Sequence, residues 1–390
     1  MTGLPLDGIT VVGLEQAVAA PFATRQLADL GARVIKIERP DGGDFARGYD
    51  TVVGGESSAF VWLNRGKESV QLDLADGEGL ATLHRLLARA DVLVANLAPA
   101  ALERRGLTPT ALAPRHPHLI TCLVSGYPPG GPSERKKAYD ALVQAEAGLM
   151  SLTGHPAAPA KVGISIADIA AGCYAYSGVL AALRHRDRTG EALPVRVSLF
   201  GALTEWMAYP LYYTAHSGAA PVPMGTAHPT IAPYGAVTAG DGRSVMIAVQ
   251  NEREWARLAT DVLDEPGLAT DPRFASNSQR VAHRGDLDAA LTAACARLPA
   301  DVLVERLDAA GIAWSRLTEL ADLEHHPELA PAARWLRTPT QAGEVRTLRP
   351  PGAPGDRVAA GGAVPALGAH TAAVLAELAE GLAEGLEEEQ

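Results

Sequence analysis

The chain has 390 residues, of which 47% are hydrophobic, and it carries a formal net charge of −11 at pH 7. Its length predicts two domains, and its acidic balance argues against a binder of nucleic acids or anionic membranes. The three cysteines are widely spaced, which argues against a disulfide framework and suits a reducing compartment. The chain has no signal-peptide pattern and no apolar run of about 18 residues, the length of a membrane span. These observations predict a soluble, cytoplasmic protein.

The first part of the chain alternates strand and helix patterns. Residues 9–14 form a short apolar run that is typical of a buried strand. Residues 17–30 have helical spacing, and Gly31 ends that helix before a strand at 34–37. The alternation continues with strands predicted at 69–74, 91–95 and 119–124 and a helix predicted at 76–89. Repeated βα units predict an α/β fold with a parallel, Rossmann-like sheet covered by helices.

The rest of the chain predicts a second domain between two linkers. Helices are expected at 140–153 and 166–186, and the latter is rich in alanine and glycine, which permit close packing or close approach of a ligand. A strand near 245–249 and helices near 253–263, 287–297 and 300–310 follow. We therefore expect a large domain over 1–217 completed by 335–390, a linker at 218–233, a small α+β domain over 225–330, a return linker at 338–365, and a C-terminal helix within 366–390.

Several familiar motifs are absent. No GxGxxG follows the first strand, which disfavours a dinucleotide-dependent dehydrogenase. No Walker A loop, GxSxG elbow or HExxH helix is present. His325 and His326 have no further residues at metal-ligand spacing, so that no metal site is expected.

Short motifs follow one another along nearly the whole chain, at 5–9, 19–21, 27–32, 34–38, 64–67, 72–74, 90–94, 139–140, 144–145, 148–150, 168–190, 271–274 and 367–371. In this order they resemble the class III CoA-transferases, the family of formyl-CoA and carnitine CoA-transferases, which also contains α-methylacyl-CoA racemases. The resemblance implies a ring-shaped chain in an interlocked homodimer, with the site between the large domain and the partner's small domain. It also implies a CoA thioester as substrate and no tightly bound cofactor.

The resemblance places the nucleophile at Asp168. In this family an aspartate just inside a helix follows a Pro-x-x-x-Gly segment, which is 159–163 here. Its carboxylate attacks the thioester of an acyl-CoA, and a mixed anhydride and then an aspartyl-CoA thioester form. We expect the helix N-terminus to keep this carboxylate ionised and to offer amides to an oxyanion. From position alone, Asp168 would only complement the helix dipole, and Asp140 is a rival carboxylate that we interpret as structural.

The resemblance also implies a CoA-binding set, which consists of Val18, Ala19, Arg39, Asn96, Leu97, Arg104, Lys137 and Tyr139. The basic residues and the asparagine suit the phosphates and adenine, although each basic residue alone is also typical of a solvated surface. Val18 and Ala19 match a loop along the pantetheine. Val18 replaces a glutamine of some relatives, and Gln16 is the candidate to take over that role. Arg196, where relatives usually carry aspartate, is interpreted as packing at a strand.

Two alternative functions remain open. An α-methylacyl-CoA racemase needs a His/Asp base pair, but Tyr139 occupies the position of its histidine, and tyrosine is a weak base near neutral pH. His155 is the remaining candidate base. A non-catalytic CoA-binding protein would not need an intact Asp168.

The substrates are predicted only from the family. We expect succinyl-CoA as the donor and a C4–C6 dicarboxylate such as citramalate, mesaconate or itaconate as the acceptor. The distal carboxylate of such an acid needs a cation, for which His228, Arg253 and Arg47 are the candidates.

Overall fold

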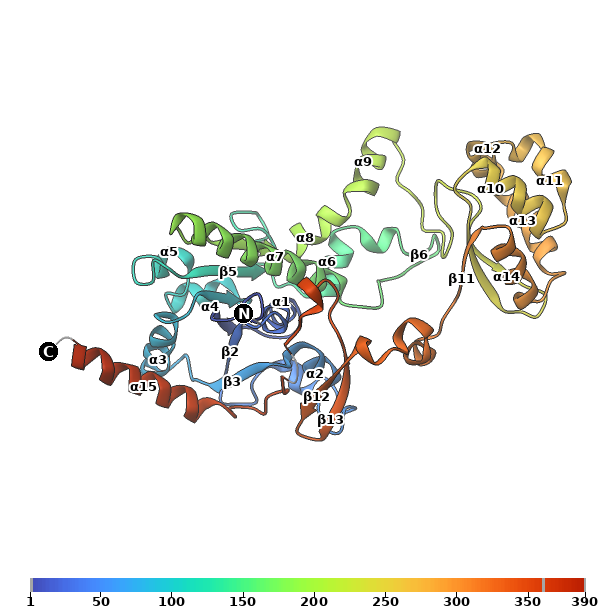
Figure 1. Cartoon of the computed structure of the whole chain (residues 1–390). Coiled ribbons are helices and arrows are strands. Elements are labelled where there is room, and N and C mark those ends of the chain that lie inside the picture. Colours follow the sequence, from blue (N-terminus) through green and yellow to red (C-terminus); the bar gives the residue numbers. More distant parts are fainter. Residues whose placement is uncertain (1–2, 360–361, 389–390) are drawn as a thin grey trace. The chain divides into compact units, whose positions relative to one another are not determined.

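The computed structural model describes residues 3–359 and 362–388 and divides the chain into two compact units (Figure 1). The large unit comprises Met1–Ala147, Val162–Ala208 and Pro331–Gln390, and the small unit comprises Gly148–Lys161 and Tyr209–Ala330. The chain therefore enters the small unit twice. Sequence patterns did not separate the first of these segments, because it is too short to have a composition of its own.

A six-stranded parallel sheet forms the centre of the large unit. The strands are buried along most of their length, as expected for apolar runs covered on both faces. Their order is β3-β2-β1-β4-β5-β8, which is the doubly wound order with a switch point between β1 and β4. The predicted α/β fold is thereby confirmed. The bounds are β1 Thr10–Leu14, β2 Arg33–Glu38, β3 Lys67–Gln71, β4 Val92–Ala95, β5 Ile120–Ser125 and β8 Val195–Ser198.

Helices cover both faces of this sheet. One face packs against leucine-rich helices, namely α3 Gly77–Leu87, α4 Pro99–Arg104, α5 Pro109–Leu112 and α15 Thr371–Glu388. The other face packs against α1 Ala19–Asp29 and α7 Ile166–Thr189, which also contact each other extensively. Shorter helices complete the unit, namely α2 Ser58–Asn64, α6 Asp140–Glu146 and α8 Leu199–Trp206.

Helix α6 is shorter than predicted. It ends at Glu146, and Gly148 then adopts a left-handed conformation with φ of 82°. A 3-10 turn, Leu149–Ser151, follows. Residues 140–153 therefore do not form one helix, because a left-handed residue cannot continue a right-handed one.

The 24-residue helix α7 has the length and mean hydropathy of a membrane span, and 44% of its most apolar window is buried. In the structure it is a core helix that packs against α1, β5 and β8. Its glycines account for this packing. A Cβ on Gly172 would lie 2.7 Å from the Ala19 carbonyl oxygen, and one on Gly178 would lie 2.7 Å from a Val195 methyl. The predicted role of small residues in close helix packing is confirmed.

The outer edge of β3 is closed by a segment from the far end of the sequence. The amide of Ser69 donates to Nδ1 of His370, and the amide of Gln71 donates to Oγ1 of Thr371. The Ser69 hydroxyl in turn accepts from the amide of Gly368. An edge strand whose backbone groups are paired in this way cannot recruit another strand. Beside this segment the chain forms a hairpin of β12 Trp335–Thr340 and β13 Gly343–Leu348.

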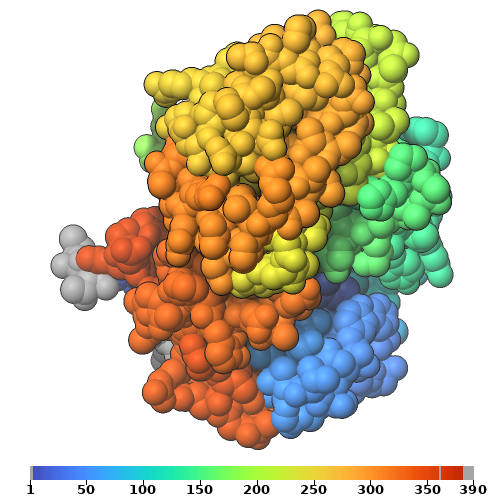
Figure 2. Space-filling model, turned by 90° about the vertical axis from the view of Figure 1, so that its right-hand side faces the viewer, coloured from blue at the N-terminus to red at the C-terminus, as the bar shows by residue number. Residues whose placement is uncertain are grey.

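The small unit has its own sheet and its own core. Its antiparallel sheet has the order β11-β10-β9, and its core gathers Trp255, Phe274 and Leu307, all almost fully buried. Figure 2 shows the outer surface of this unit in yellow and orange. Its strands are β6 Gly154–His155, β7 Ala158–Pro159, β9 Tyr234–Thr238, β10 Ser244–Ala248 and β11 Ala313–Arg316, and its helices are α10 Glu252–Arg257, α11 Pro266–Thr270, α12 Asn277–Ala282, α13 Arg284–Cys295 and α14 Ala300–Ala309.

Two helices of the small unit depart from the expected pattern. The predicted helix at 253–263 is α10 followed by a π-helical turn, Leu258–Val262. Helix α9, Ala208–Ser217, begins at the border of the two units and contains no buried residue.

Candidate active site

The loops at the carboxyl edge of the large sheet bring the first predicted residues together. Gln16 follows β1, Arg39 follows β2 and Asn96 follows β4, and these three strands are neighbours. The Asn96 side chain bridges the switch point, because its oxygen accepts from the Gln16 amide at 2.8 Å and its nitrogen donates to the Gln16 carbonyl at 2.8 Å. Open α/β sheets bind ligands at this crevice. Asn96, predicted to contact CoA, thus fastens the loop that precedes α1.

The start of α1 offers backbone groups. Val18 is the N-cap residue of α1 but has no capping side chain, and its side chain and that of Ala19 are buried. The first N–H groups of a helix have no partners within the helix. At Val18 and Ala19 the chain therefore offers a ligand backbone N–H groups and no polar side chain. The Gln16 side chain, proposed to replace the glutamine missing at position 18, has a buried Oε1 without a partner among the described residues.

Helices α1 and α7 begin at the same end of the large unit. Gly172 in α7 abuts Ala19 and Phe22 in α1. One turn further along α7, burial and then the negative charge of Asp29, the last residue of α1, raise the pKa of Tyr176. Asp168 lies one turn before Gly172, so it lies beside the residues with which α1 begins. The positive ends of two helix dipoles converge there.

Asp168 is half-buried in the first turn of α7, and Asp140 caps that turn. The Oδ1 atom of Asp140 accepts from the amides of Ala167 at 2.8 Å and Asp168 at 3.4 Å, and its other oxygen accepts from Gln144 at 2.7 Å. Burial and then the negative charge of Asp140 raise the pKa of Asp168 to about 7. Desolvation and a like charge thus shift the pKa of Asp168 in the direction opposite to that expected from the helix dipole.

Two tyrosines lie near Asp168. Tyr139, predicted as a CoA contact, is the N-cap residue of α6 and is 69% exposed. Tyr49 follows the turn Phe45–Gly48 and is half-exposed. Burial and then the charges of Asp44, Asp168 and Tyr139 raise the pKa of Tyr49, so the two tyrosines and the carboxylate share one electrostatic neighbourhood. Tyr49 was missed, because a single exposed aromatic residue in a loop carries no sequence signal.

The predicted phosphate-binding residues lie on the surface around this edge. Arg39 donates to the Gly43 carbonyl at 2.9 Å and stacks on Phe45. Arg104 ends α4, and Lys137 lies in the loop before α6. Both are exposed and have no ion pair with any residue in the described ranges. Exposed cations of this kind suit the phosphates of CoA.

Leu97 lines an open pocket of about 600 Å³ between α4, β5 and β8. The pocket walls are mainly apolar, and Arg196 stands among the lining residues. Arg196 lies on β8, the edge strand, with its side chain exposed. The interpretation of Arg196 as strand packing is therefore wrong, because an edge strand leaves it uncovered.

The three candidate cations for a distal carboxylate differ in their surroundings. Arg47 is engaged by the Glu38 carboxylate at 2.7 Å, by the Pro365 carbonyl and by the Phe60 ring, so that it is a structural residue. His228, in the small unit, accepts the Thr230 amide on Nδ1 at 3.2 Å, which leaves Nε2 as the donor. Arg253 is exposed at the start of α10.

Comparison with known proteins decides the family. The model of CoA-transferase family III matches residues 6–371. The chain belongs to CoA-transferase family III. The resemblance inferred from the motifs is thereby confirmed, as is the expectation that the chain is a transferase enzyme.

Relatives and solved structures of family III agree. Acetyl-CoA:oxalate CoA-transferase of Acetobacter aceti is 37% identical over 84% of this chain and 84% of its own. Succinate–glutarate CoA-transferase of Agrobacterium fabrum is 38% identical over 72% of either chain. The crystal structure of a CAIB/BAIF family protein from Brucella suis superposes with a TM-score of 0.84, at 35% identity over 97% of this chain and 100% of that one.

The chemistry of family III involves acyl-CoA thioesters and carboxylic acids as substrates. Within residues 3–359 and 362–388, no three His, Cys, Asp or Glu side chains form a group that could hold a metal ion.

Proposed function

We propose that this chain transfers CoA from succinyl-CoA to a C4–C6 dicarboxylic acid such as citramalate, mesaconate or itaconate. The observation that carries the proposal is Asp168, a half-buried carboxylate where two helix N-termini converge. Among the relatives, one is named for succinate and glutarate, and others are named as succinyl-CoA-dependent transferases of D-citramalate and mesaconate. A perturbed carboxylate at the ligand-binding edge of an α/β sheet is typical of a reacting group.

The proposed reaction proceeds by two acyl exchanges on Asp168. The Asp168 carboxylate attacks the thioester carbonyl carbon of the donor, the C–S bond breaks, and a mixed succinyl-aspartyl anhydride and CoA thiolate form. The thiolate then attacks the aspartyl carbonyl and releases succinate. The acceptor carboxylate displaces CoA thiolate from the aspartyl thioester, and the thiolate attacks the resulting anhydride at the acceptor carbonyl. Amides at the start of α1 stabilise the oxyanions of these steps, since the amides of Ala167 and Asp168 in α7 already donate to Asp140.

The arrangement around Asp168 disfavours a racemase. A racemase needs a second base across the α-carbon, and the position expected for its histidine carries Tyr139, an exposed phenol in place of an imidazole. His155, the alternative base, belongs to the small unit. A passive CoA-binding protein would not need the intact Asp168 that this chain has.

We also propose an interlocked homodimer in the cytoplasm. Support comes from α9, where Tyr209, Leu211 and Tyr212 are each more than half exposed. Aromatic and aliphatic side chains gathered on one short helix are typical of a surface that a partner covers. Light scattering of the purified protein measures the mass, and a monomer at micromolar concentration would contradict the proposal.

The experiment that tests the function supplies succinyl-CoA and a panel of dicarboxylic acids and identifies new CoA esters by mass spectrometry. Acetyl-CoA serves as a second donor. We expect citramalyl-, mesaconyl- or itaconyl-CoA from the wild type and a loss of at least about 1,000-fold for Asp168→Asn. Asp187→Asn, at the exposed end of the same helix, is the matched control. Exchange of the α-hydrogen of a 2-methylacyl-CoA without transfer would replace this function by racemisation.

A further inference from the structure

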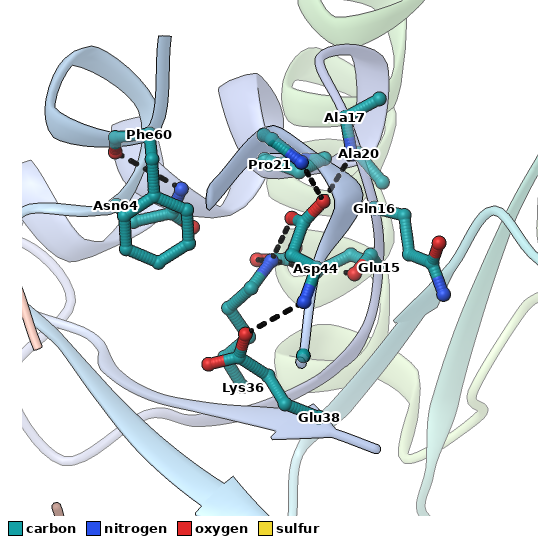
Figure 3. A network of polar contacts seen from close by, with 12 residues as sticks. Glu15, Gln16, Ala17, Ala20, Pro21, Lys36, Glu38, Asp44, Phe60 and Asn64 are labelled. Atoms are coloured by element: carbon teal, nitrogen blue, oxygen red, sulfur yellow. Dashed lines mark hydrogen bonds and ion pairs between the residues drawn. The ribbon is translucent and has the colours of Figure 1, made fainter. Parts of the chain in front are cut away.

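A network of charged side chains is buried beneath the loop that precedes α1. Glu15, Lys36, Asp44 and Lys67 are all almost fully buried, and we call them the buried charge network. Figure 3 shows Glu15, Lys36 and Asp44 beneath the loop that contains Gln16 and Ala17. Lys36 lies 2.7 Å from an Asp44 oxygen and 3.4 Å from a Glu15 oxygen, and Lys67 lies 2.6 Å from Glu15. Two positive and two negative charges thus neutralise one another in the interior.

Side chains of the buried charge network form hydrogen bonds with the backbone of one short segment, residues 15–21. Lys36 donates to the Glu15 carbonyl at 3.3 Å, and Lys67 donates to the Pro21 carbonyl at 3.1 Å. The amide of Ala17 donates to Oδ1 of Asp44 at 2.9 Å. From the other side, Asn96 holds both backbone groups of Gln16. The main chain that leads into α1 is therefore held at five of its atoms, three by the buried side chains of Lys36, Lys67 and Asp44 and two by the part-buried Asn96.

Ala17 shows why such fastening is needed. Its φ is 60°, in the left-handed region, where a residue with a Cβ is strained. Such a conformation persists only where its surroundings impose it. The amide of Ala17 points at Asp44, and this bond fixes the turn after which Val18 and Ala19 begin the helix beside Asp168. Without an acceptor at that place, Ala17 would relax toward negative φ and redirect the following amides.

Fold stability alone does not explain the network. Buried ion pairs are expensive to desolvate, and apolar residues of similar volume would stabilise the interior as well or better. Asp44 in addition accepts from the amide of Ala46 at 2.9 Å and donates its own amide to Glu38 at 3.0 Å. Asp44 therefore links Lys36 and Glu38 of β2 to the amide of Ala17.

We propose that Asp44 is a positioning residue for the transfer reaction: neutralised by Lys36, it holds the amide of Ala17 and so aims the first amides of α1 at the thioester that reacts with Asp168. This inference rests on the proposed function and deepens it. Asp44 does not touch the substrate. It acts through the loop 15–18.

Two double variants separate positioning from charge burial. Lys36→Met, Asp44→Asn and Lys36→Met, Asp44→Ala both remove the ion pair without leaving a lone charge, but only the asparagine keeps an oxygen for the Ala17 amide. We expect kcat of the asparagine variant within about fivefold of wild type. We expect kcat of the alanine variant to fall about 100-fold, with KM for succinyl-CoA within about threefold. Asp91→Asn is the matched control, since Asp91 likewise pairs with a cation, Arg186, and holds an amide, that of Thr10 at the other end of β1.

Hydrogen–deuterium exchange gives a readout that does not depend on activity. Peptides covering residues 15–24 should exchange faster in the alanine variant and at the wild-type rate in the asparagine variant and the control. Equal kcat and equal exchange in the two double variants would overturn the role of Asp44. Should the wild type transfer no CoA from any donor, the proposed function fails, and the exchange of this segment still decides whether Asp44 holds the loop.

Discussion

The pKa of Asp168 is set by its burial and by Asp140, a residue that is distant from it in the sequence. Asp140, 28 residues earlier, caps the α7 N-terminus and places its own charge beside Asp168. Burial and then the charge of Asp140 raise the pKa of the Asp168 carboxyl to about 7. The residue that orders the start of the helix thus also contributes to this shift.

The raised pKa of Asp168 predicts that Asp168→Asn stabilises the protein at alkaline pH. An acid whose pKa is higher in the folded state than the 3.8 of the unfolded chain opposes folding when it is ionised. This penalty is complete above pH 7 and disappears as the pH falls toward 3.8. We expect the variant to be about 1–3 kcal/mol more stable than wild type at pH 8 and nearly equal at pH 4. Urea unfolding at both pH values measures this, and a less stable variant at pH 8 would contradict it.

At this scale the sequence predicts Asp168 as the nucleophile through its motif, but it did not predict the residues that surround the neighbouring loop. Asp44 and Lys67 are separated from their partner residues in sequence, and their contacts exist only after the sheet forms. A signal was nevertheless present in β2. Lys36 and Glu38 interrupt a strand that is otherwise apolar, and a charge in a strand covered on both faces must find a buried partner.

Helices and strands were predicted best where an apolar run decides the structure. The strands β1, β2, β4 and β5 agree with the expected ranges to within one residue. The predicted bounds were wrong where the backbone of one residue or one charge determines the structure. The left-handed Gly148 follows the end of α6. Strand β3 begins two residues before its expected start, at the buried Lys67, which pairs with Glu15. Periodicity does not register either effect.

The substitution of glycine by alanine should have opposite effects at two helical glycines, because only one of them, Gly172, lies in the contact between α1 and α7. Replacing a helical glycine by alanine normally stabilises a protein by about 0.5–1 kcal/mol, as we expect at Gly267, whose surroundings are open. Gly172→Ala instead places its Cβ 2.7 Å from the Ala19 carbonyl oxygen and forces the helices apart, at a cost of about 1–3 kcal/mol. Thermal unfolding of both variants measures the two signs, and stabilisation at both positions would refute the close contact.

In the whole molecule, the apolar residues form separate cores. The core around Trp255 and Phe274 draws only on residues of the small unit, and the core that includes Val12 and Leu93 draws only on the large one. Each unit therefore buries enough apolar surface to fold as a cooperative body. Composition predicted a boundary near the linker at 218–233 because proline and glycine mark it, whereas it could not reveal that 148–161 joins the small unit.

Separate cores predict separate unfolding. Phe274→Ala should remove about 3–5 kcal/mol from the small unit and leave the large unit unchanged. In calorimetry we expect two transitions, of which one moves to lower temperature. Hydrogen exchange in the strands β1 to β5 serves as the internal control. A single transition that moves as a whole would show that the units unfold together.

The closure of the β3 edge has a consequence for synthesis of the chain. Ser69 leaves the ribosome 301 residues before His370, which pairs with it. At roughly 5–20 residues per second, the outer edge of the sheet remains unpaired for about 15–60 s in every newly made molecule. During that interval the nascent sheet presents an open template to other strands. The time-critical step in producing this protein is therefore the arrival of its last segment, and slower initiation or chaperone capacity will govern yield more than the stability of the finished fold.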